Sequence, residues 1–303
     1  MGAGGGGIGG PKGGVSGEGG AFGFTLPPRR PVRRSGPARG TRTAGTSGGP
    51  GSCYHLPMRA WVARLKKGTE PLNYGRETMA AMARRHFASA GKSELRVLDL
   101  GAGTGADLSN VALSLGPERC RLAGIESNPQ AARALSSKGI EVHALDLERD
   151  PFPFGDAEVD LVLANQVLEH TKEIFWILAE TVRVLRPEGC LLVGLPNLAS
   201  LHNRVLLLFG AQPSSIEWLG PHVRGATAEG FLRFAMTGGF LQVREVRGGN
   251  FYPLPAALAR PMSRALPRMA VSLFFRLERT TRAGSFLEVL AGAGYETPFY
   301  RGG

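Results

Sequence analysis

The stretch LRVLDLGAGTGADLSN, residues 95 to 110, constrains the fold of this chain more than any other. Its first six residues are mostly apolar and predict a buried β-strand that runs directly into a glycine-rich turn. Glycine has no Cβ, so Gly101, Gly103 and Gly105 allow a tight turn and a close approach of a ligand to the backbone. The turn opens a predicted helix, residues 106–115, whose free N–H groups favour the polar end of a nucleotide-like ligand.

Asp99 lies inside this apolar strand, two residues before the turn. It would repel a pyrophosphate by about 1 to 4 kcal/mol at an effective dielectric of 20 to 80, which argues against a dinucleotide. A cofactor with an ammonium group would instead be attracted. S-adenosyl-L-methionine carries such an ammonium, together with a carboxylate, a ribose and an adenine. The alternative is that Asp99 only accepts hydrogen bonds from neighbouring backbone N–H groups.

Strand and helix patterns alternate from Arg76 onward. Helices are predicted at 76–90, 106–115, 129–137 and 171–186, and strands at 95–100, 121–126, 140–145, 159–164 and 190–195. Short apolar strands separated by helices are typical of a parallel sheet that is covered on both faces. The predicted fold class is therefore α/β, doubly wound. After an insert at about 198–226, we expect a helix at 228–239, a strand at 240–246 and a return of residues 285–292 to the sheet.

Polar residues follow the next three predicted strands. Glu126, about twenty residues after the glycine turn, is placed to accept hydrogen bonds from two ribose hydroxyls. Asp146 stands where a carboxylate accepts from an adenine amino group, with Leu147 against the ring; its alternative role is that of a turn residue. The segment ANQVLEH, residues 164 to 170, follows the fourth strand at the carboxyl edge, where open α/β sheets bind ligands.

The segments VLDLGAGTG, GIESNP, DLE, VDLVLANQVLEH and VLRPEGCLLVGLPN resemble, in this order, the motifs of the class I S-adenosylmethionine-dependent methyltransferases. The resemblance spans about residues 94 to 197 and implies a Rossmann-like, doubly wound sheet of seven strands, mostly parallel with an antiparallel last strand. The candidate cofactor-binding residues are Asp99, Gly101, Ala102, Gly103, Gly105, Glu126, Ser127, Asp146, Leu147, Asn165 and Gln166.

Three histidines are candidates for the catalytic base, because a methyl acceptor with a hydroxyl or amine must lose a proton. They are His170 after the fourth strand, and His202 and His222 in the insert. Some metal-dependent O-methyltransferases carry a glutamate where this chain has Gln166, three residues before Glu169. Hard dications prefer carboxylates, so no metal is expected at Glu169 and His170.

The insert at about 198–226 is expected to form a substrate lid, with ordinary helix packing as its alternative. Its apolar residues, mixed with a few cations, suit a small or amphipathic acceptor such as a lipid-linked or glycan-linked metabolite. Residues 257–282 alternate apolar residues with arginines, as an interfacial helix in weak peripheral membrane contact would. A cover over the sheet is the alternative for this segment.

Residues 1–57 hold 19 of the 44 glycines, 7 of the 21 prolines and a net charge of +6 out of +11. Such a composition cannot bury enough apolar surface to order itself, so we expect a disordered tail ahead of a methyltransferase domain at 58–303. The tail could also bind nucleic acid or anionic lipid, or serve as a transit segment. Three cysteines and no secretory signal indicate a reducing compartment, the cytoplasm.

The leading function is methyl transfer from S-adenosyl-L-methionine to a small or amphipathic acceptor, with oxygen as the favoured atom. One alternative is an RNA or protein methyltransferase guided by the Arg-rich tail. The other is a non-catalytic protein that binds the cofactor and acts as a partner subunit. No DNA partner is expected, because the body of the chain is only mildly basic.

Overall fold

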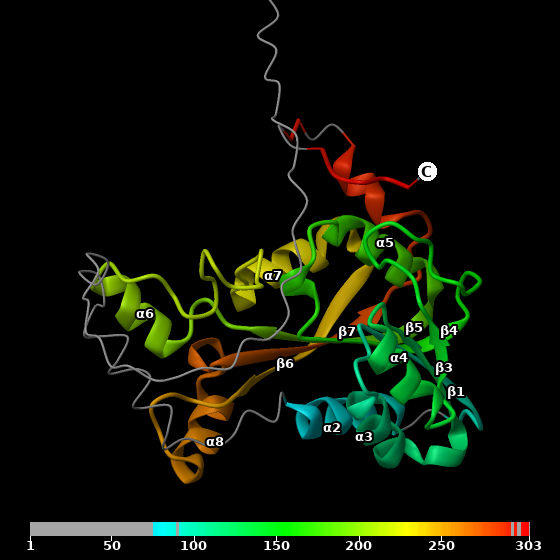
Figure 1. The fold of residues 1–303 in the computed structure, drawn as a ribbon, viewed down its shortest axis with the longest axis horizontal. Coiled ribbons are helices and arrows are strands. Elements are labelled where there is room, and N and C mark those ends of the chain that lie inside the picture. Colours follow the sequence, from blue (N-terminus) through cyan, green and yellow to red (C-terminus); the bar gives the residue numbers. More distant parts are fainter. Residues whose placement is uncertain (1–74, 89–90, 292–293, 296–297, 303) are drawn as a thin grey trace, which may run out of the picture. The chain divides into compact units, whose positions relative to one another are not determined.

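The computed structural model describes residues 75–88, 91–291, 294–295 and 298–302, so the predicted tail at 1–57 lies outside the described residues. The described residues form a seven-stranded sheet of order β3-β2-β1-β4-β5-β7-β6 (Figure 1). The strands are β1 Leu95–Leu100, β2 Cys120–Ile125, β3 Glu141–His143, β4 Val159–Asn165, β5 Leu185–Pro196, β6 Leu241–Gly249 and β7 Ser272–Arg279. Neighbouring strands from β1 to β5 pair in parallel, whereas β7 is antiparallel to both β5 and β6. The predicted α/β class and antiparallel last strand are confirmed.

Helices cover both faces of the sheet (Figure 1). They are α2 Arg76–Phe87, α3 Ala106–Leu115, α4 Pro129–Ser136, α5 Ile174–Val184, α6 Leu201–Leu208, α7 Ala228–Ala235 and α8 Ala256–Ala265, with 3₁₀ turns η2 Leu168–His170, η4 Pro267–Met269 and η5 Phe286–Leu290. Buried residues of α2, α3 and α4 form one core with one face of the sheet, and those of α5, α7 and η5 form the other.

The central residues of strand β4, Leu161 to Ala164, are all apolar because both faces of the strand are covered. Leu161 and Leu163 belong to the core under α2 and α3, whereas Val162 and Ala164 belong to the core under α5. Successive side chains of a strand point to opposite faces, so a run of apolar residues is expected where helices cover both faces of a central strand. The ends of β1 and β4 are therefore held rigidly, side by side, at the carboxyl edge of the sheet.

Two predictions for the C-terminal third are wrong. Residues 285–292 do not return to the sheet, because Phe286 and Leu290 form the buried side of η5. Residues 257–282 do not form one interfacial helix either: the segment contains α8, η4 and then β7, the strand between β5 and β6. Leu273, Phe275 and Leu277 recur with a period of two and are all buried, so β7 belongs to the core of the sheet.

Smaller differences concern element lengths. The third predicted strand, 140–145, shortens to Glu141–His143, and the fifth, 190–195, lengthens to Leu185–Pro196. The predicted helix at 228–239 ends at Ala235 and gives way to a 3₁₀ turn that contains Gly238 in a left-handed conformation. None of the helices in the described part of the chain has both the length and the apolar character that crossing a bilayer requires.

Candidate functional site

The glycine turn after β1 combines packing with open space. Gly101 and Gly105 have φ of +64° and +79°; a Cβ there would lie 2.9 Å from Val167 Cγ2 and 2.7 Å from Leu135 Cδ2, respectively. Gly103 has φ of +54°, yet a Cβ on it would meet no other described atom within 4 Å. Gly101 and Gly105 are thus required by the protein's own packing, whereas Gly103 presents bare backbone to a space that a ligand can fill.

We expect Gly101→Ala to lower the free energy of unfolding by about 1–3 kcal/mol, because alanine at a left-handed φ is strained and its methyl group would overlap Val167. Urea denaturation measures this change. Gly91→Ala is the matched control, since Gly91 has no positive φ and no described atom within 4 Å of its Cβ position. Equal losses of stability in the two variants would contradict the packing role of Gly101.

Asp99 is a buried carboxyl group, only 2% exposed, on β1 between Gly124 of β2 and Leu163 of β4. Burial raises its pKa well above the usual range, and the negative charges of Asp107 and Glu126 raise the pKa further. Three carboxyl groups therefore act on one another around the glycine turn. A bound ammonium group would favour the charged form of Asp99 and relieve this repulsion.

Glu126 links the end of β2 to the glycine turn. Its Oε2 accepts a hydrogen bond of 2.8 Å from the Gly103 N–H, and its Oε1 accepts one of 2.7 Å from the Asn128 N–H. A carboxylate has about four acceptor positions, so the predicted contact with ribose hydroxyls stays compatible with these two bonds. The neighbouring Ser127 is exposed.

Asp146 and Leu147 follow β3 in a turn. Asp146 is exposed, and its Oδ1 accepts a 2.9 Å hydrogen bond from the Glu148 N–H. It therefore acts as a turn residue, which was the alternative to a contact with adenine. Leu147 is partly buried against the core under α5. Their contact with an adenine remains a prediction.

Asn165 is the last residue of β4, and Gln166 follows it directly. Asn165 Nδ2 donates to Asp107 Oδ2 at 3.2 Å, which connects β4 to the first turn of α3. Gln166 has a left-handed φ of +57° and donates its backbone N–H to the Gly194 carbonyl at 2.9 Å. Asp107 was missed by the sequence analysis; its acidic side chain in the first turn of the helix after the glycine turn was the available signal. Ala102 is buried within the turn.

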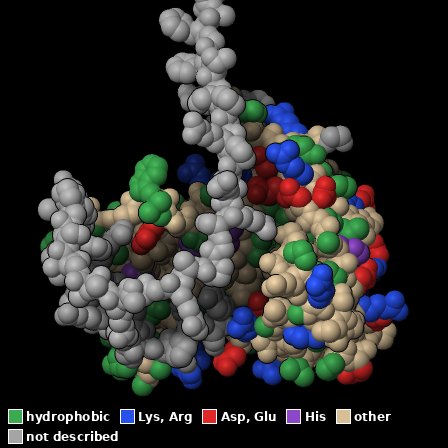
Figure 2. Space-filling model, viewed as in Figure 1, with side chains coloured by type: hydrophobic (Ala, Val, Ile, Leu, Met, Phe, Trp, Pro, Cys, Tyr) green, Lys and Arg blue, Asp and Glu red, His purple; other side chains and the backbone are tan. Residues whose placement is uncertain are grey.

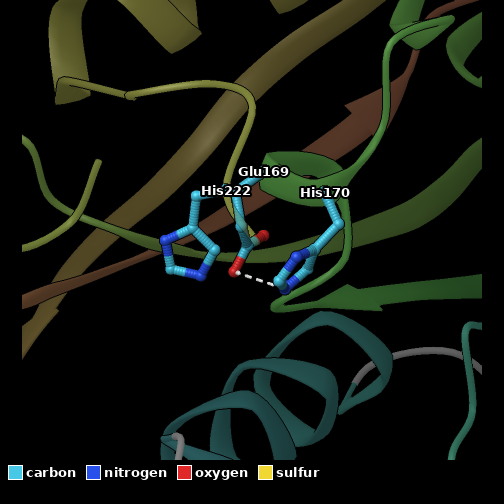
Figure 3. Close-up of side chains that lie close together, drawn as sticks. All are labelled: Glu169, His170 and His222. Atoms are coloured by element: carbon cyan, nitrogen blue, oxygen red, sulfur yellow. Dashed lines mark ion pairs between the residues drawn. The ribbon is translucent and has the colours of Figure 1, made fainter. Parts of the chain in front are cut away.

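Two of the three candidate histidines lie together, with Glu169 beside them (Figure 3). The ring centroids of His170 and His222 are 4.7 Å apart, and His170 Nε2 lies 3.9 Å from Glu169 Oε1. His202, on α6, instead hydrogen bonds through its two ring nitrogens to the hydroxyls of Ser200 and Ser214. The structure thus separates His202 from the pair.

Each ring of the pair is oriented by a backbone carbonyl. His170 Nδ1 lies 3.2 Å from the Pro221 oxygen, and His222 Nδ1 lies 2.8 Å from the Ser215 oxygen. A carbonyl only accepts hydrogen bonds, so these contacts assign the proton of each neutral ring to Nδ1 and the lone pair to Nε2. Both Nε2 atoms are therefore suited to accept a proton or bind a cation.

Glu169 is the most unusual group at this edge. Its side chain is 1% exposed, neither carboxylate oxygen has a hydrogen-bond partner among the described residues, and burial raises its pKa to about 7. Its backbone oxygen accepts hydrogen bonds from the N–H groups of Val223 and Arg224 at 2.8 and 3.2 Å. These bonds attach the end of the insert to η2.

A cavity of about 590 Å³ opens beside Glu169, between α5, α7 and residues 223–227. Its aromatic lining consists of Phe175, Phe231, Phe234, Tyr295 and Phe299. Glu169 and Arg224 are the charged residues in the lining, and Arg224 Nε donates to the Thr171 carbonyl at 3.0 Å. An apolar cavity with a few polar groups is typical of a small-molecule site.

A sheet of order 3-2-1-4-5-7-6 with an antiparallel seventh strand, a glycine turn after β1 and a carboxylate after β2 define a Rossmann-like methyltransferase fold of class I. Residues 98–193, about a third of the 303-residue chain, match the family model described as a methyltransferase domain. This segment is therefore a class I methyltransferase domain, the kind whose methyl donor is S-adenosylmethionine.

Relatives match over part of their length. The chain is 34% identical over 107 residues to an uncharacterized 37.1 kDa protein in transposon TN4556 of Streptomyces fradiae, covering 34% of this chain and 31% of that protein. It is 34% identical over 125 residues to the thiol S-methyltransferase TMT1A of Homo sapiens, covering 37% of this chain and 49% of that protein. The chain thus spans about half or less of the length of these two relatives.

Among solved structures, one similar chain is the 1,6-didemethyltoxoflavin-N1-methyltransferase of Burkholderia thailandensis. It is 15% identical, with a TM-score of 0.44, and the match covers 78% of this chain and 93% of that one.

Proposed function

We propose that this protein transfers a methyl group from S-adenosyl-L-methionine to a hydroxyl oxygen of a small, amphipathic acceptor. The observation that carries the proposal is that the predicted cofactor site and an aromatic cavity adjoin the same short segment after β4. Gln166, at the predicted cofactor site, is three residues from Glu169, which borders the aromatic cavity. A short chain segment therefore connects the methyl donor's site to a site suited to an acceptor.

The residues around the glycine turn fit the cofactor. Asp99 would hold its ammonium group, Glu126 its ribose hydroxyls, and the open space beside Gly103 leaves room for its main body. When bound, S-adenosylmethionine supplies an electrophilic methyl group on a positively charged sulfur. The protein's task is then to hold donor and acceptor in line and to exclude water.

The insert supports an amphipathic acceptor. Several of its large apolar side chains are exposed rather than packed, namely Leu207, Leu208, Phe209, Trp218 and Leu219. Figure 2 shows hydrophobic side chains on the surface near α6. Together with the aromatic cavity, they favour a lipid-linked or glycan-linked metabolite with an apolar part.

We assign the removal of the proton from the acceptor hydroxyl to the group formed by Glu169, His170 and His222. The three side chains lie together at the carboxyl edge, and Glu169 also lines the cavity. The carbonyl contacts of both Nδ1 atoms assign the lone pair of each ring to Nε2. His202 is less suited, because its ring nitrogens already hydrogen bond to two serines.

We also propose a cytoplasmic location, on the cysteine content alone.

Incubating the full chain with methyl-labelled cofactor and a cell extract tests this function. We expect label in the lipid or glycan pool, carried on oxygen. Label in RNA or protein would overturn the proposed acceptor class, and cofactor binding without any labelled product would support the non-catalytic alternative. The human relative named above is a thiol S-methyltransferase, so a panel of purified acceptors should include thiols; label on sulfur would overturn the assignment to oxygen.

Phe234→Ala tests the cavity. Removing one aromatic wall should raise the KM for the acceptor by about tenfold, since a lost aromatic contact costs on the order of 1–2 kcal/mol, and leave the Kd for the cofactor unchanged. Leu113→Ala, an exposed leucine on α3 outside the cavity lining, is the control and should change neither constant. An unchanged acceptor KM in Phe234→Ala would place the acceptor elsewhere.

A further inference from the structure

We propose that Glu169, His170 and His222 form a binding site for one divalent transition-metal ion at the carboxyl edge of β4. One ligand atom from each residue can be chosen so that all three lie within 4.8 Å of one another (Figure 3). Two of the residues belong to η2 and the third comes from the insert, 52 residues further along the chain. The site therefore exists only in the folded protein.

Glu169 is buried without a compensating partner among the residues that the structure describes. A buried carboxylate costs free energy unless hydrogen bonds or an opposite charge compensate it. Neither of its oxygens has a hydrogen-bond partner in the described part of the chain, although the side chain is 1% exposed. The buried Asp160, by comparison, accepts hydrogen bonds from Lys92 and Arg186. A cation between Glu169 and the two rings would supply the compensation that Glu169 lacks.

The two histidines are oriented as metal ligands usually are. Metal-binding histidines usually donate their other ring N–H to a carboxylate or backbone carbonyl, which fixes the ring and its tautomer. Here, Nδ1 of His170 faces the Pro221 carbonyl and Nδ1 of His222 faces the Ser215 carbonyl. Both carbonyls belong to the same insert as His222. This loop therefore supplies one ligand and orients both imidazoles, with each Nε2 left free to bind.

The donor set indicates the kind of metal. Mg²⁺ and Ca²⁺ prefer oxygen ligands, whereas two imidazoles and one carboxylate suit Zn²⁺, Mn²⁺, Co²⁺ or Fe²⁺ and leave further positions open. The His170 side chain is 40% exposed, so solvent or an acceptor can reach the site. His222 supplies the third ligand that the sequence around Gln166, Glu169 and His170 does not contain.

A metal ion bound at the carboxyl edge of β4 would act as a Lewis acid, which can lower the pKa of a hydroxyl group bound to it. Metal binding by these three residues does not depend on methyl transfer, because it is measured without cofactor or acceptor. Failure of the proposed acceptor chemistry would leave the metal site standing, and the converse also holds.

The test is titration of the metal-stripped full chain with Co²⁺, followed by visible absorption, and with Zn²⁺, followed by calorimetry. We expect one ion per chain, visible absorption from the bound Co²⁺, and a higher Tm with Zn²⁺. Glu169→Gln, His170→Ala and His222→Ala should each weaken binding by more than about tenfold, since losing even an outer partner of a ligand costs 10- to 100-fold.

His143→Gln is the matched control, because His143 Nε2 also lies beside a carboxylate oxygen, 2.9 Å from Glu141 Oε1, but on β3. It should bind both ions as the wild type does. His170→Ala removes an exposed ring and keeps the test valid if another variant fails to fold. Binding that is absent in the wild type, or that is equal in the wild type and all three ligand variants, would overturn the proposal.

Discussion

Asp99→Asn is expected to weaken S-adenosylmethionine binding by about 3–4 kcal/mol, or roughly two to three powers of ten in Kd. Asparagine keeps the size of the side chain but removes the negative charge that would face the ammonium group. The same substitution should raise the Tm of the free protein. Asp99 is 2% exposed and its ionised form is disfavoured by burial, by Asp107 and by Glu126, so a neutral amide removes an unfavourable charge. Calorimetric titration and thermal unfolding measure the two effects.

Asp160→Asn is the matched control, a second buried aspartate, on the adjacent strand β4. Its carboxylate accepts hydrogen bonds from Lys92 Nζ, Arg186 Nη1 and the Arg96 N–H. Removing this charge should lower the Tm and leave the Kd for the cofactor unchanged, the opposite of the Asp99 variant on both counts. Asp99→Asn with wild-type affinity would show that Asp99 does not hold the ammonium.

Cofactor affinity of the wild type should rise with pH. Because the pKa of Asp99 is raised in the free protein, its carboxyl group is protonated at pH values where an ordinary aspartate is charged. Binding an ammonium requires the charged form, so each bound cofactor must displace a proton below that raised pKa. Affinity therefore falls by up to about tenfold for each pH unit below it. Above the raised pKa of Asp99, the affinity should stay constant until the cofactor's own amino group loses its proton near pH 8.

Calorimetry between pH 5 and 7.5, in buffers of different ionisation enthalpy, reports both the affinity and the protons released. The charged groups that act on Asp99 are Asp107 on α3 and Glu126 after β2, so Asp107→Asn should lower the pKa of Asp99 and shift the affinity profile to lower pH. In Asp99→Asn the profile should be flat. Proton release of the same size in wild type and Asp99→Asn would assign the titration to another group.

The central part of the fold is predictable from the sequence because its signals are local. The apolar run before Gly101 and the helix after Gly105 appear in the structure as β1 and α3, with α3 at the predicted bounds, Ala106–Leu115. Strands buried on both faces leave an unmistakable apolar run, and a glycine turn leaves its own composition. The residues at the ends of these strands could therefore be placed at one edge of the sheet.

Three features were not predictable, namely strand β7, the position of His222 and the contacts of Asp107, because each depends on contacts between distant segments. The alternation of apolar residues with arginines in residues 257–282 suggested an interfacial helix, whereas the pairing of β7 with both β5 and β6 decides the conformation of residues 272–279. His222 could not be assigned to His170 and Glu169, because no periodicity specifies how a 29-residue insert folds back, roughly 198–226. The hydrogen bonds from Val223 and Arg224 to the Glu169 carbonyl produce that placement. Asp107 likewise contacts Asn165 and raises the pKa of Asp99 only in the folded chain.

The most direct test of the central claim, that the buried acid before the glycine turn selects a cationic cofactor, is calorimetric competition on the purified chain. S-adenosylmethionine and its demethylated product, which retains the same amino-acid end, should both bind at one site per chain. A nicotinamide dinucleotide should neither bind nor compete. Affinity for the dinucleotide, with none for S-adenosylmethionine or its product, would contradict the claim.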